Sequence, residues 1–178
     1  MKVGLLAPPW LPVPPPAYGG TEVVIDALAR GLVKAGHEVR VFTVGESDVP
    51  VPIDYVHEHA VDEQMGDGIV ELGHIAEGYE ALSGCDIIHD HTLAGPLWAL
   101  AHGYQQVVTT CHGPLTDDFH RVYRAYGKQL PVIAISHDQA ARAPDVTIAQ
   151  VIHHGIDPQQ FHAGDGQGGY LLFLGRMS

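Results

Sequence analysis

Short apolar runs that alternate with helical intervals are the feature that most restricts the fold of this 178-residue chain. Runs of this length are typical of parallel strands buried on both faces of a sheet. Alternation of strands and helices predicts right-handed crossovers and an open, doubly wound parallel α/β sheet. The six runs are Lys2–Ala7 (KVGLLA), Glu38–Val44 (EVRVFTV), Asp86–His91 (DIIHDH), Gln106–Cys111 (QVVTTC), Pro131–Ser136 (PVIAIS) and Thr147–His153 (TIAQVIH).

The segments between these runs carry weaker signals. The prolines of Pro8–Tyr18 predict a loop, because proline lacks the backbone donor that helices and sheets need. Apolar residues recur at helical spacing from Gly20 to a stop at Gly36. Within residues 48–82 we expect a strand at Tyr55–His59 and a helix at Ile69–Leu82.

Two further local patterns concern the second half of the chain. Ser136 followed by Gln139 fits a capping box at the start of a helix. The sequence GDGQGG at 164–169 has the composition of a flexible linker, and Tyr170–Leu174 (YLLFL) resembles the start of another buried strand. We therefore expect one domain at 1–163, with 164–178 as the linker and first strand of a second domain in a longer parent protein.

Charge and cysteine content exclude several classes of protein. The formal net charge of −12 argues against a general nucleic-acid binder or an anionic membrane surface as partner. The apolar residues near the amino terminus are too few to span a membrane. Only Cys85 and Cys111 are present, and they form neither a disulfide framework nor a zinc motif. These features lead us to expect a cytoplasmic protein.

Adjacent glycines, Gly19 and Gly20, separate the first expected strand from the first helix. Glycines allow backbone N–H groups to approach a ligand closely, and a helix amino terminus carries partial positive charge. The pair therefore suggests a phosphate-binding turn. A tight turn without a ligand is the alternative, since the chain has neither GxGxxG after this strand nor a GxxxxGK[ST] loop.

Histidines gather where two expected strands end. His89 and His91 are two residues apart, so on a strand they share one face, and His112 after the next strand should reach the same crevice. This placement suggests ligand contacts or catalysis. A metal site that also uses His153 and His154 is the alternative, although no HExxH or comparable ligand spacing supports it.

Six motifs taken in order connect the chain to a known family. The chain resembles the amino-terminal half of retaining, nucleotide-sugar-dependent glycosyltransferases of glycosyltransferase family 4, across nearly its whole length. The resemblance implies the GT-B architecture, in which two Rossmann-like domains face each other across a cleft. The motifs are GG followed by Thr and Glu (19–22), DIIHDH (86–91), VVTTCHGP (107–114), VIAIS (132–136), VIHHGID (151–157) and LLFLGRMS (171–178).

The resemblance also implies roles for individual residues. His91 corresponds to the histidine beside the transferred sugar and is the expected catalytic residue. Gly19, Gly20 and Arg176 correspond to residues that contact the donor diphosphate. A nucleoside-diphosphate sugar would be a co-substrate, and no cofactor or metal is implied. Residues in the same motifs that are candidates for substrate binding are Thr21, Glu22, Thr92, His112, Gly113 and Asp157.

Departures from the family pattern leave alternatives open. His154 stands where the family often has asparagine, and the second domain's paired glutamates and phosphate-binding lysine do not occur in the sequence. We therefore expect the chain to need the second domain of its parent for activity, with an acceptor that the sequence does not identify. A sugar-nucleotide epimerase of the same architecture and a non-catalytic binding module are the alternatives.

Overall fold

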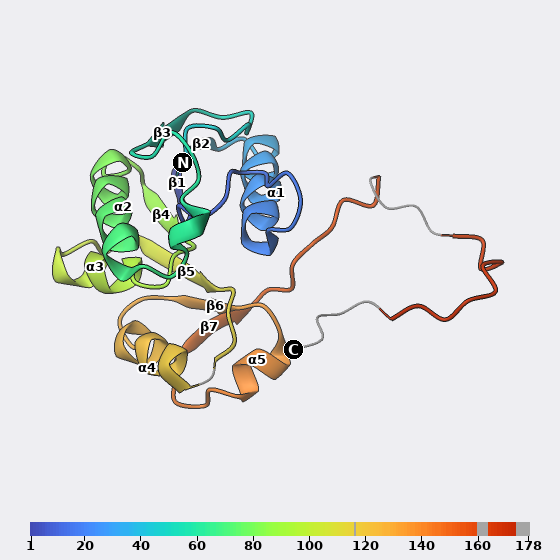
Figure 1. Ribbon diagram of the computed structural model, residues 1–178. Coiled ribbons are helices and arrows are strands. Elements are labelled where there is room, and N and C mark those ends of the chain that lie inside the picture. The colour runs from blue at the N-terminus through green and yellow to red at the C-terminus, as the bar shows by residue number, and fades with distance from the viewer. Residues whose placement is uncertain (116, 160–163, 174–178) are drawn as a thin grey trace.

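A single parallel sheet forms the centre of the molecule in the computed structural model, which describes residues 1–115, 117–159 and 164–173. The strands are β1 (Lys2–Leu6), β2 (Glu38–Thr43), β3 (Ile53–Tyr55), β4 (Ile87–Asp90), β5 (Val107–Cys111), β6 (Val132–Ala134) and β7 (Ile148–Val151). Their order is β3-β2-β1-β4-β5-β6-β7, and every neighbouring pair is parallel (Figure 1). The predicted α/β class and parallel topology are confirmed.

Helices connect the strands as the alternation predicted. They are α1 (Gly20–Lys34), α2 (Gly68–Ala81), α3 (Gly95–Ala101), α4 (Asp117–Tyr126) and α5 (His137–Ala141), with one 3-10 helix, η1 (Asp62–Gln64). Proline-rich residues 8–18 form the irregular connection from β1 to α1. No helix in the part of the chain that the structure describes is both long and apolar enough to cross a membrane.

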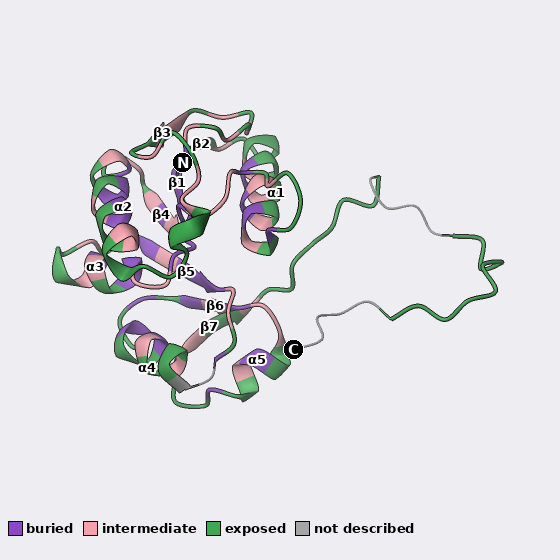
Figure 2. Cartoon of the chain, viewed as in Figure 1, coloured by how far each residue is buried: buried purple, intermediate pink, exposed green. Residues whose placement is uncertain are grey.

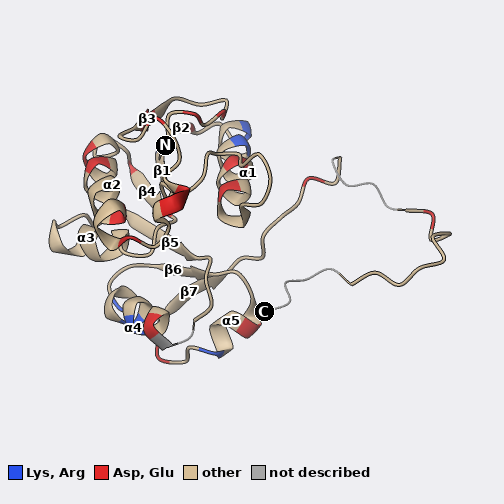
Figure 3. Ribbon diagram, in the orientation of Figure 1, with Lys and Arg blue, Asp and Glu red and all other residues tan. Residues whose placement is uncertain are grey.

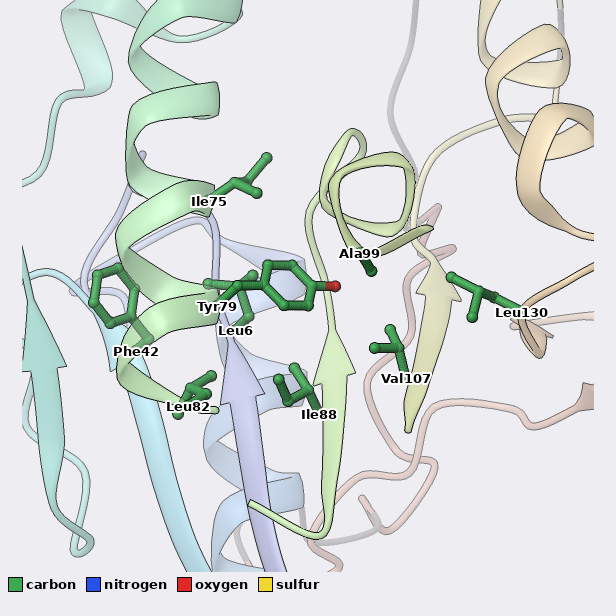
Figure 4. Packing of buried hydrophobic residues seen from close by; sticks show 9 residues of the cluster. All are labelled: Leu6, Phe42, Ile75, Tyr79, Leu82, Ile88, Ala99, Val107 and Leu130. Atoms are coloured by element: carbon green, nitrogen blue, oxygen red, sulfur yellow. The ribbon is translucent and has the colours of Figure 1, made fainter. Parts of the chain in front are cut away.

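The core has two sides because side chains alternate along each strand. Leu5 of β1 packs on the side of Ile25 in α1, whereas Leu6 packs on the opposite side with Tyr79 of α2. Figure 4 shows the second of these clusters, and Figure 2 shows that the buried residues follow the strands and the inner faces of the helices. A third cluster around Tyr126 joins α4 to β5 and β6. Each strand residue therefore faces either the α1 side or the α2 side of the sheet.

The segment 48–82 differs partly from the prediction. The expected helix is confirmed as α2, which begins one residue earlier because the Asp67 carboxylate accepts hydrogen bonds from the backbone N–H groups of Ile69 and Val70. The expected strand at Tyr55–His59 is wrong, since β3 ends at Tyr55. Residues 57 and 58 instead accept hydrogen bonds from the loop that follows β2, at Gly45 and Glu46.

The carboxyl-terminal segment also differs from the prediction. Tyr170–Leu174 was expected to form a strand, but residues 170–173 have no strand structure and their side chains are at least 74% exposed. A strand requires a hydrogen-bonding neighbour, and no described strand lies beside this segment. Leu174 lies outside the described residues. Beyond β7 the chain leaves the sheet as an extended segment (Figure 1).

Candidate functional site

The carboxyl ends of the strands and the amino end of α1 border one open pocket of about 370 Å³. The strand order reverses beside β1, because β2 lies on one side of it and β4 on the other. Open α/β sheets bind ligands at such a point. The residues that line the pocket are Pro8, Trp10, Leu11, Tyr18, Gly19, Gly20, Thr21, Glu22, Met65, His112, Ile135 and His154.

The two glycines of the pocket have different surroundings. A β-carbon on Gly19 would lie 2.7 Å from the Cβ of Pro15 and 2.8 Å from Oε2 of Glu22, so the turn leaves no room for a side chain there. A β-carbon on Gly20 would meet no atom within 4 Å. Packing therefore explains the glycine at position 19. The open space beside Gly20 belongs to the pocket and is available to a ligand.

The amino end of α1 is a polar wall of the pocket. No side chain caps this helix end, so N–H groups of its first turn have no partner within the helix. Glu22 lies in that turn and is only 4% exposed. Burial raises the pKa of the Glu22 carboxyl group. A hydrogen bond from the backbone N–H of the same residue acts in the opposite direction and is the smaller effect. The turn thus offers donors to an anionic group, beside one buried carboxyl.

His89 in β4, His91 directly after β4 and His112 directly after β5 lie on the side of the sheet that α1 covers. His89 and His91 stack with ring centroids 4.2 Å apart, and Nε2 of His89 lies 2.7 Å from the Thr110 hydroxyl. Nδ1 of His91 lies 2.8 Å from Nε2 of His112, so one nitrogen of that pair donates a proton and the other accepts it. The strand periodicity that suggested a shared crevice thus brings these side chains together.

The imidazoles form a neutral cluster at pH 7. His154 joins it by stacking on His112 with ring centroids 5.3 Å apart. Burial lowers the pKa of His89 to about 4 and that of His112 to about 3, and it holds the pKa of His91 well below its usual value. Nε2 of His91 is buried without a hydrogen-bond partner among the described residues. This nitrogen is enclosed and His91 does not itself line the pocket, so His91 borders the site through its hydrogen bond to His112.

The Asp90 side chain lies on the opposite side of the sheet from His91 and holds the turn after β4 in place. Its carboxylate accepts hydrogen bonds from the Tyr79 hydroxyl and from both the backbone N–H and the hydroxyl of Thr92, each at 2.7 Å. Burial raises the pKa of Asp90 to about 6. The Thr92 hydroxyl in turn accepts the N–H of Gly95 at 3.0 Å. Thr92, a predicted substrate-binding residue, thus has its hydroxyl engaged within the protein.

Gln139 is a site-supporting residue that the sequence indicated only as part of a capping box. The Ser136 hydroxyl accepts the backbone N–H of Gln139, as that motif predicts. The Gln139 side chain reaches further: it accepts the N–H of Ile135 at 2.8 Å and donates to the carbonyls of Cys111 (3.0 Å) and Gly113 (2.8 Å). It therefore connects the ends of β5 and β6 beneath the pocket.

The remaining predicted residues lie elsewhere. Asp157 is exposed, does not line the pocket, and accepts the backbone N–H of Gln159 at 2.9 Å. Arg176 lies outside the described residues. For the alternative of a metal site, no group of three or more His, Cys, Asp or Glu side chains in ranges 1–115, 117–159 and 164–173 is placed to hold an ion.

Most of the apolar half of the pocket is not indicated by any pattern in the sequence. Trp10 and Leu11 come from the proline-rich loop, Met65 from the turn after η1, and Ile135 from the end of β6. The loop residues carry no periodic signal that would place them in space. Ile135 belongs to an expected strand, and its position two residues beyond Ile133 on the same face could have suggested it.

Comparisons with known proteins agree with this geometry. The family model described as Glycosyltransferase Family 4 matches residues 18–160. AviGT4, a glycosyltransferase involved in avilamycin A biosynthesis, has 23% sequence identity and a TM-score of 0.56 over 91% of this chain and 44% of its own. Sucrose-phosphate synthase from Thermosynechococcus elongatus has 16% identity and a TM-score of 0.65 over 90% of this chain and 50% of its own. No curated protein matches the chain.

The two solved structures agree on the fold of this chain. The chain spans about half the length of the two solved structures. At such low identity the structural likeness shows a shared fold, which is the Rossmann-like parallel sheet of a GT-B protein. The family model covers β2 to β7, the glycine pair and the histidine cluster, and β1 lies just before the matched range. The chain therefore belongs to glycosyltransferase family 4.

Proposed function

We propose that this chain is the acceptor-side, amino-terminal domain of a retaining glycosyltransferase that moves a sugar from a nucleoside diphosphate to an acceptor hydroxyl. One observation supports the proposal most strongly. Gly20, Glu22 and His112 line a single pocket, and His91 is hydrogen-bonded to His112. Residues from three distant parts of the sequence thus converge at the carboxyl edge of the sheet, where α/β proteins bind ligands.

In the proposed reaction this domain contacts the donor mainly through hydrogen bonds from neutral groups, and less through charged side chains. N–H groups in the first turn of α1 bind diphosphate oxygens, and the helix dipole favours their negative charge. The neutral His91, whose Nε2 is enclosed and unpartnered in this structure, contacts a hydroxyl of the transferred sugar after the neighbouring side chains move aside on donor binding. The acceptor oxygen forms the new bond to the anomeric carbon as the bond to the diphosphate breaks, and the acceptor proton passes to the departing diphosphate. Stabilisation of that leaving group supplies much of the rate enhancement.

Domain organisation and location belong to the same proposal. We assign 1–163 to the acceptor-side domain and 164–178 to the linker and the start of the donor-binding domain, with Arg176 at the diphosphate; the first strand of that domain forms only when its pairing strands are present. The chain by itself is then inactive, because most of the donor-binding groups are in the other domain. Cys85 and Cys111 are both free thiols, which fits a cytoplasmic location.

Release of free nucleoside diphosphate tests the proposal. The parent protein with both domains is incubated with a panel of nucleotide sugars, with wild type compared to His91→Ala. We expect release with one preferred donor and a loss of about 100-fold or more in the variant. His59→Ala is the matched control, since its side chain is 78% exposed and lies outside the pocket lining.

The other outcomes separate the alternatives. Full activity of the His91→Ala parent would remove His91 from the mechanism. Conversion of the donor to its epimer without an acceptor would replace the transferase by an epimerase. Nucleotide-sugar binding with no turnover of any donor would favour a binding module.

A further inference from the structure

We propose, building on the proposed function, that the acceptor is an uncharged hydroxylated ring with an apolar face, and that Trp10 recognises it. Phosphorylated acceptors are excluded by the chemistry of the pocket. Two kinds of acceptor are uncharged hydroxylated rings with an apolar face, namely a sugar ring and an aromatic aglycone. The observations that carry the proposal are the apolar and aromatic lining of the pocket and its lack of cations.

Apolar and aromatic side chains make up one half of the lining. Trp10, Leu11, Tyr18, Met65 and Ile135 come from three separate segments and border the same space as Gly20 and His112. Trp10 is half-buried, so its position is restrained while part of the ring stays accessible. Aromatic rings bind the apolar faces of other rings and leave hydroxyl groups free for polar neighbours. The arrangement suits a flat, hydroxylated molecule of about one or two rings.

Among the residues that the structure describes, no lysine or arginine lines the pocket. The described arginines are each paired with an aspartate, as Arg30–Asp26, Arg40–Asp54, Arg121–Asp118, Arg124–Asp145 and Arg142–Asp138. Lys2 begins β1 and Lys34 ends α1, which places both at the opposite, amino-terminal edge of the sheet. Figure 3 shows the basic residues concentrated at one end of α1 and around α4. A phosphate on the acceptor would therefore find no cationic partner here.

The remaining polar groups of the pocket also disfavour an anion. His112 and His154 both have lowered pKa values and are neutral at pH 7. Glu22 is the one carboxylate in the described lining, and the whole chain has a net charge of −12. Phosphate recognition normally uses arginine or lysine. The amino end of α1 offers N–H donors, but the proposed function assigns them to the diphosphate of the donor.

Indole resonances of the 178-residue chain test the proposal directly. The chain has two tryptophans, Trp10 and Trp98, so its ¹H–¹⁵N spectrum contains two indole N–H peaks, which Trp98→Phe assigns. Methyl β-glucoside, phenyl β-glucoside and glucose 6-phosphate are titrated separately. We expect the Trp10 peak to shift with at least one neutral glycoside at millimolar dissociation constants, and glucose 6-phosphate to bind about tenfold more weakly or not at all. The two glycosides distinguish a sugar ring from an aromatic aglycone.

Variants make the test specific to the pocket. Trp10→Ala should weaken neutral binding about tenfold, measured by saturation-transfer NMR, while Trp10→Phe retains most of it. Trp98→Phe is the matched control, because Trp98 lies on α3 against His102 and outside the pocket lining. Met65→Lys adds a cation at an exposed position, and we expect it to raise the affinity for glucose 6-phosphate about threefold or more.

Two results would overturn the proposal. One is binding of glucose 6-phosphate to wild type as tightly as the neutral glycosides. The other is the absence of any Trp10 shift with either glycoside up to about 50 mM. If either result is found while the parent still releases nucleoside diphosphate with a preferred donor, the proposed acceptor class is rejected and the transferase proposal stands. A Trp10 shift without such release would instead reject the transferase.

Discussion

Gly19 and Gly20 are adjacent in sequence but have different reasons to be glycine. The first is enclosed by Pro15 and the carboxyl of Glu22, and the second borders empty space in the pocket. The propensity cost of glycine is smaller at a helix start than in a helix interior, so helix formation alone does not explain Gly20. Gly31 and Gly73 have equally open surroundings inside helices, so the open space at Gly20 points to a ligand only because Gly20 also lines the pocket.

Alanine substitutions should separate these two reasons. We expect Gly19→Ala to lower the free energy of unfolding by about 1–3 kcal/mol through overpacking. Gly20→Ala should leave it unchanged or raise it by up to about 1 kcal/mol, because alanine favours the helix. Urea denaturation measures both values. Equal destabilisation by the two substitutions would contradict the assignment of free space to Gly20.

The histidine pair was predictable, whereas its apolar neighbours were not. A period of two along a strand places His89 and His91 on one face from sequence alone, and the next strand of a parallel sheet brings His112 beside them. Trp10 and Met65 reach the same pocket from irregular segments. Their positions depend on tertiary contacts of the loops, which no local periodicity encodes.

Among the elements, the central strands and long helices followed the sequence pattern closely, and the peripheral ones did not. The start of α1 at Gly20 is confirmed, and α2 begins and ends one residue before its predicted limits. The edge strand β3 pairs only with β2, and three residues carry too weak a pattern to be located. Tyr170–Phe173 is apolar enough for a strand, but strand structure also requires a neighbour to pair with.

The junction of β5, β6 and α5 depends on Gln139. Gln139→Ala should lower the free energy of unfolding by about 2–3 kcal/mol, since the substitution leaves buried backbone groups at Ile135 and Cys111 without a partner. Hydrogen exchange of the Ile135 amide should accelerate more than that of amides in β1. The exposed Gln129→Ala is the matched control. Unchanged exchange at Ile135 would show that the side chain does not secure this junction.

For the whole molecule, buried neutral histidines should make stability depend on pH. His74 is fully buried, and its Nε2–H donates a hydrogen bond to the Ala7 carbonyl oxygen at 2.9 Å, because a carbonyl oxygen can only accept. Burial lowers the pKa of His74 to about 4, below the 6.5 of an unfolded chain. Protons therefore bind the unfolded state first, and stability present above pH 6.5 is lost as the pH falls toward 4.

Urea denaturation at pH 7 and pH 5 measures this effect. His74 alone should account for a loss of about 2 kcal/mol at pH 5, and His89 and His112 act in the same direction. Asp90 opposes them, because its raised pKa favours the folded state at low pH. His74→Gln should reduce the loss between the two pH values, whereas the exposed His59→Gln should not. An identical pH dependence in His74→Gln would contradict the explanation.

Removal of residues 164–178 tests the domain boundary. The described part of this segment, 164–173, is exposed and separate from the sheet. A chain that ends at 163 should therefore unfold within about 0.5 kcal/mol of the full chain in thermal denaturation. A chain that ends at 146 lacks β7 and should be clearly less stable. A similar loss in both truncations would mean that 164–178 packs against the domain.

The strict alternation along β4 has a consequence for how this protein can change over evolution or by engineering. Ile88 and Asp90 belong to the side of α2, and His89 and His91 to the side of α1. Deleting or inserting one residue within the strand would exchange the two sets, so that an imidazole would enter the hydrocarbon interior and a carboxylate would enter the ligand pocket. Substitutions can accumulate in this strand one at a time. Changes of length can be accommodated only in the loops, so the loops are where the lining of the pocket can change most readily.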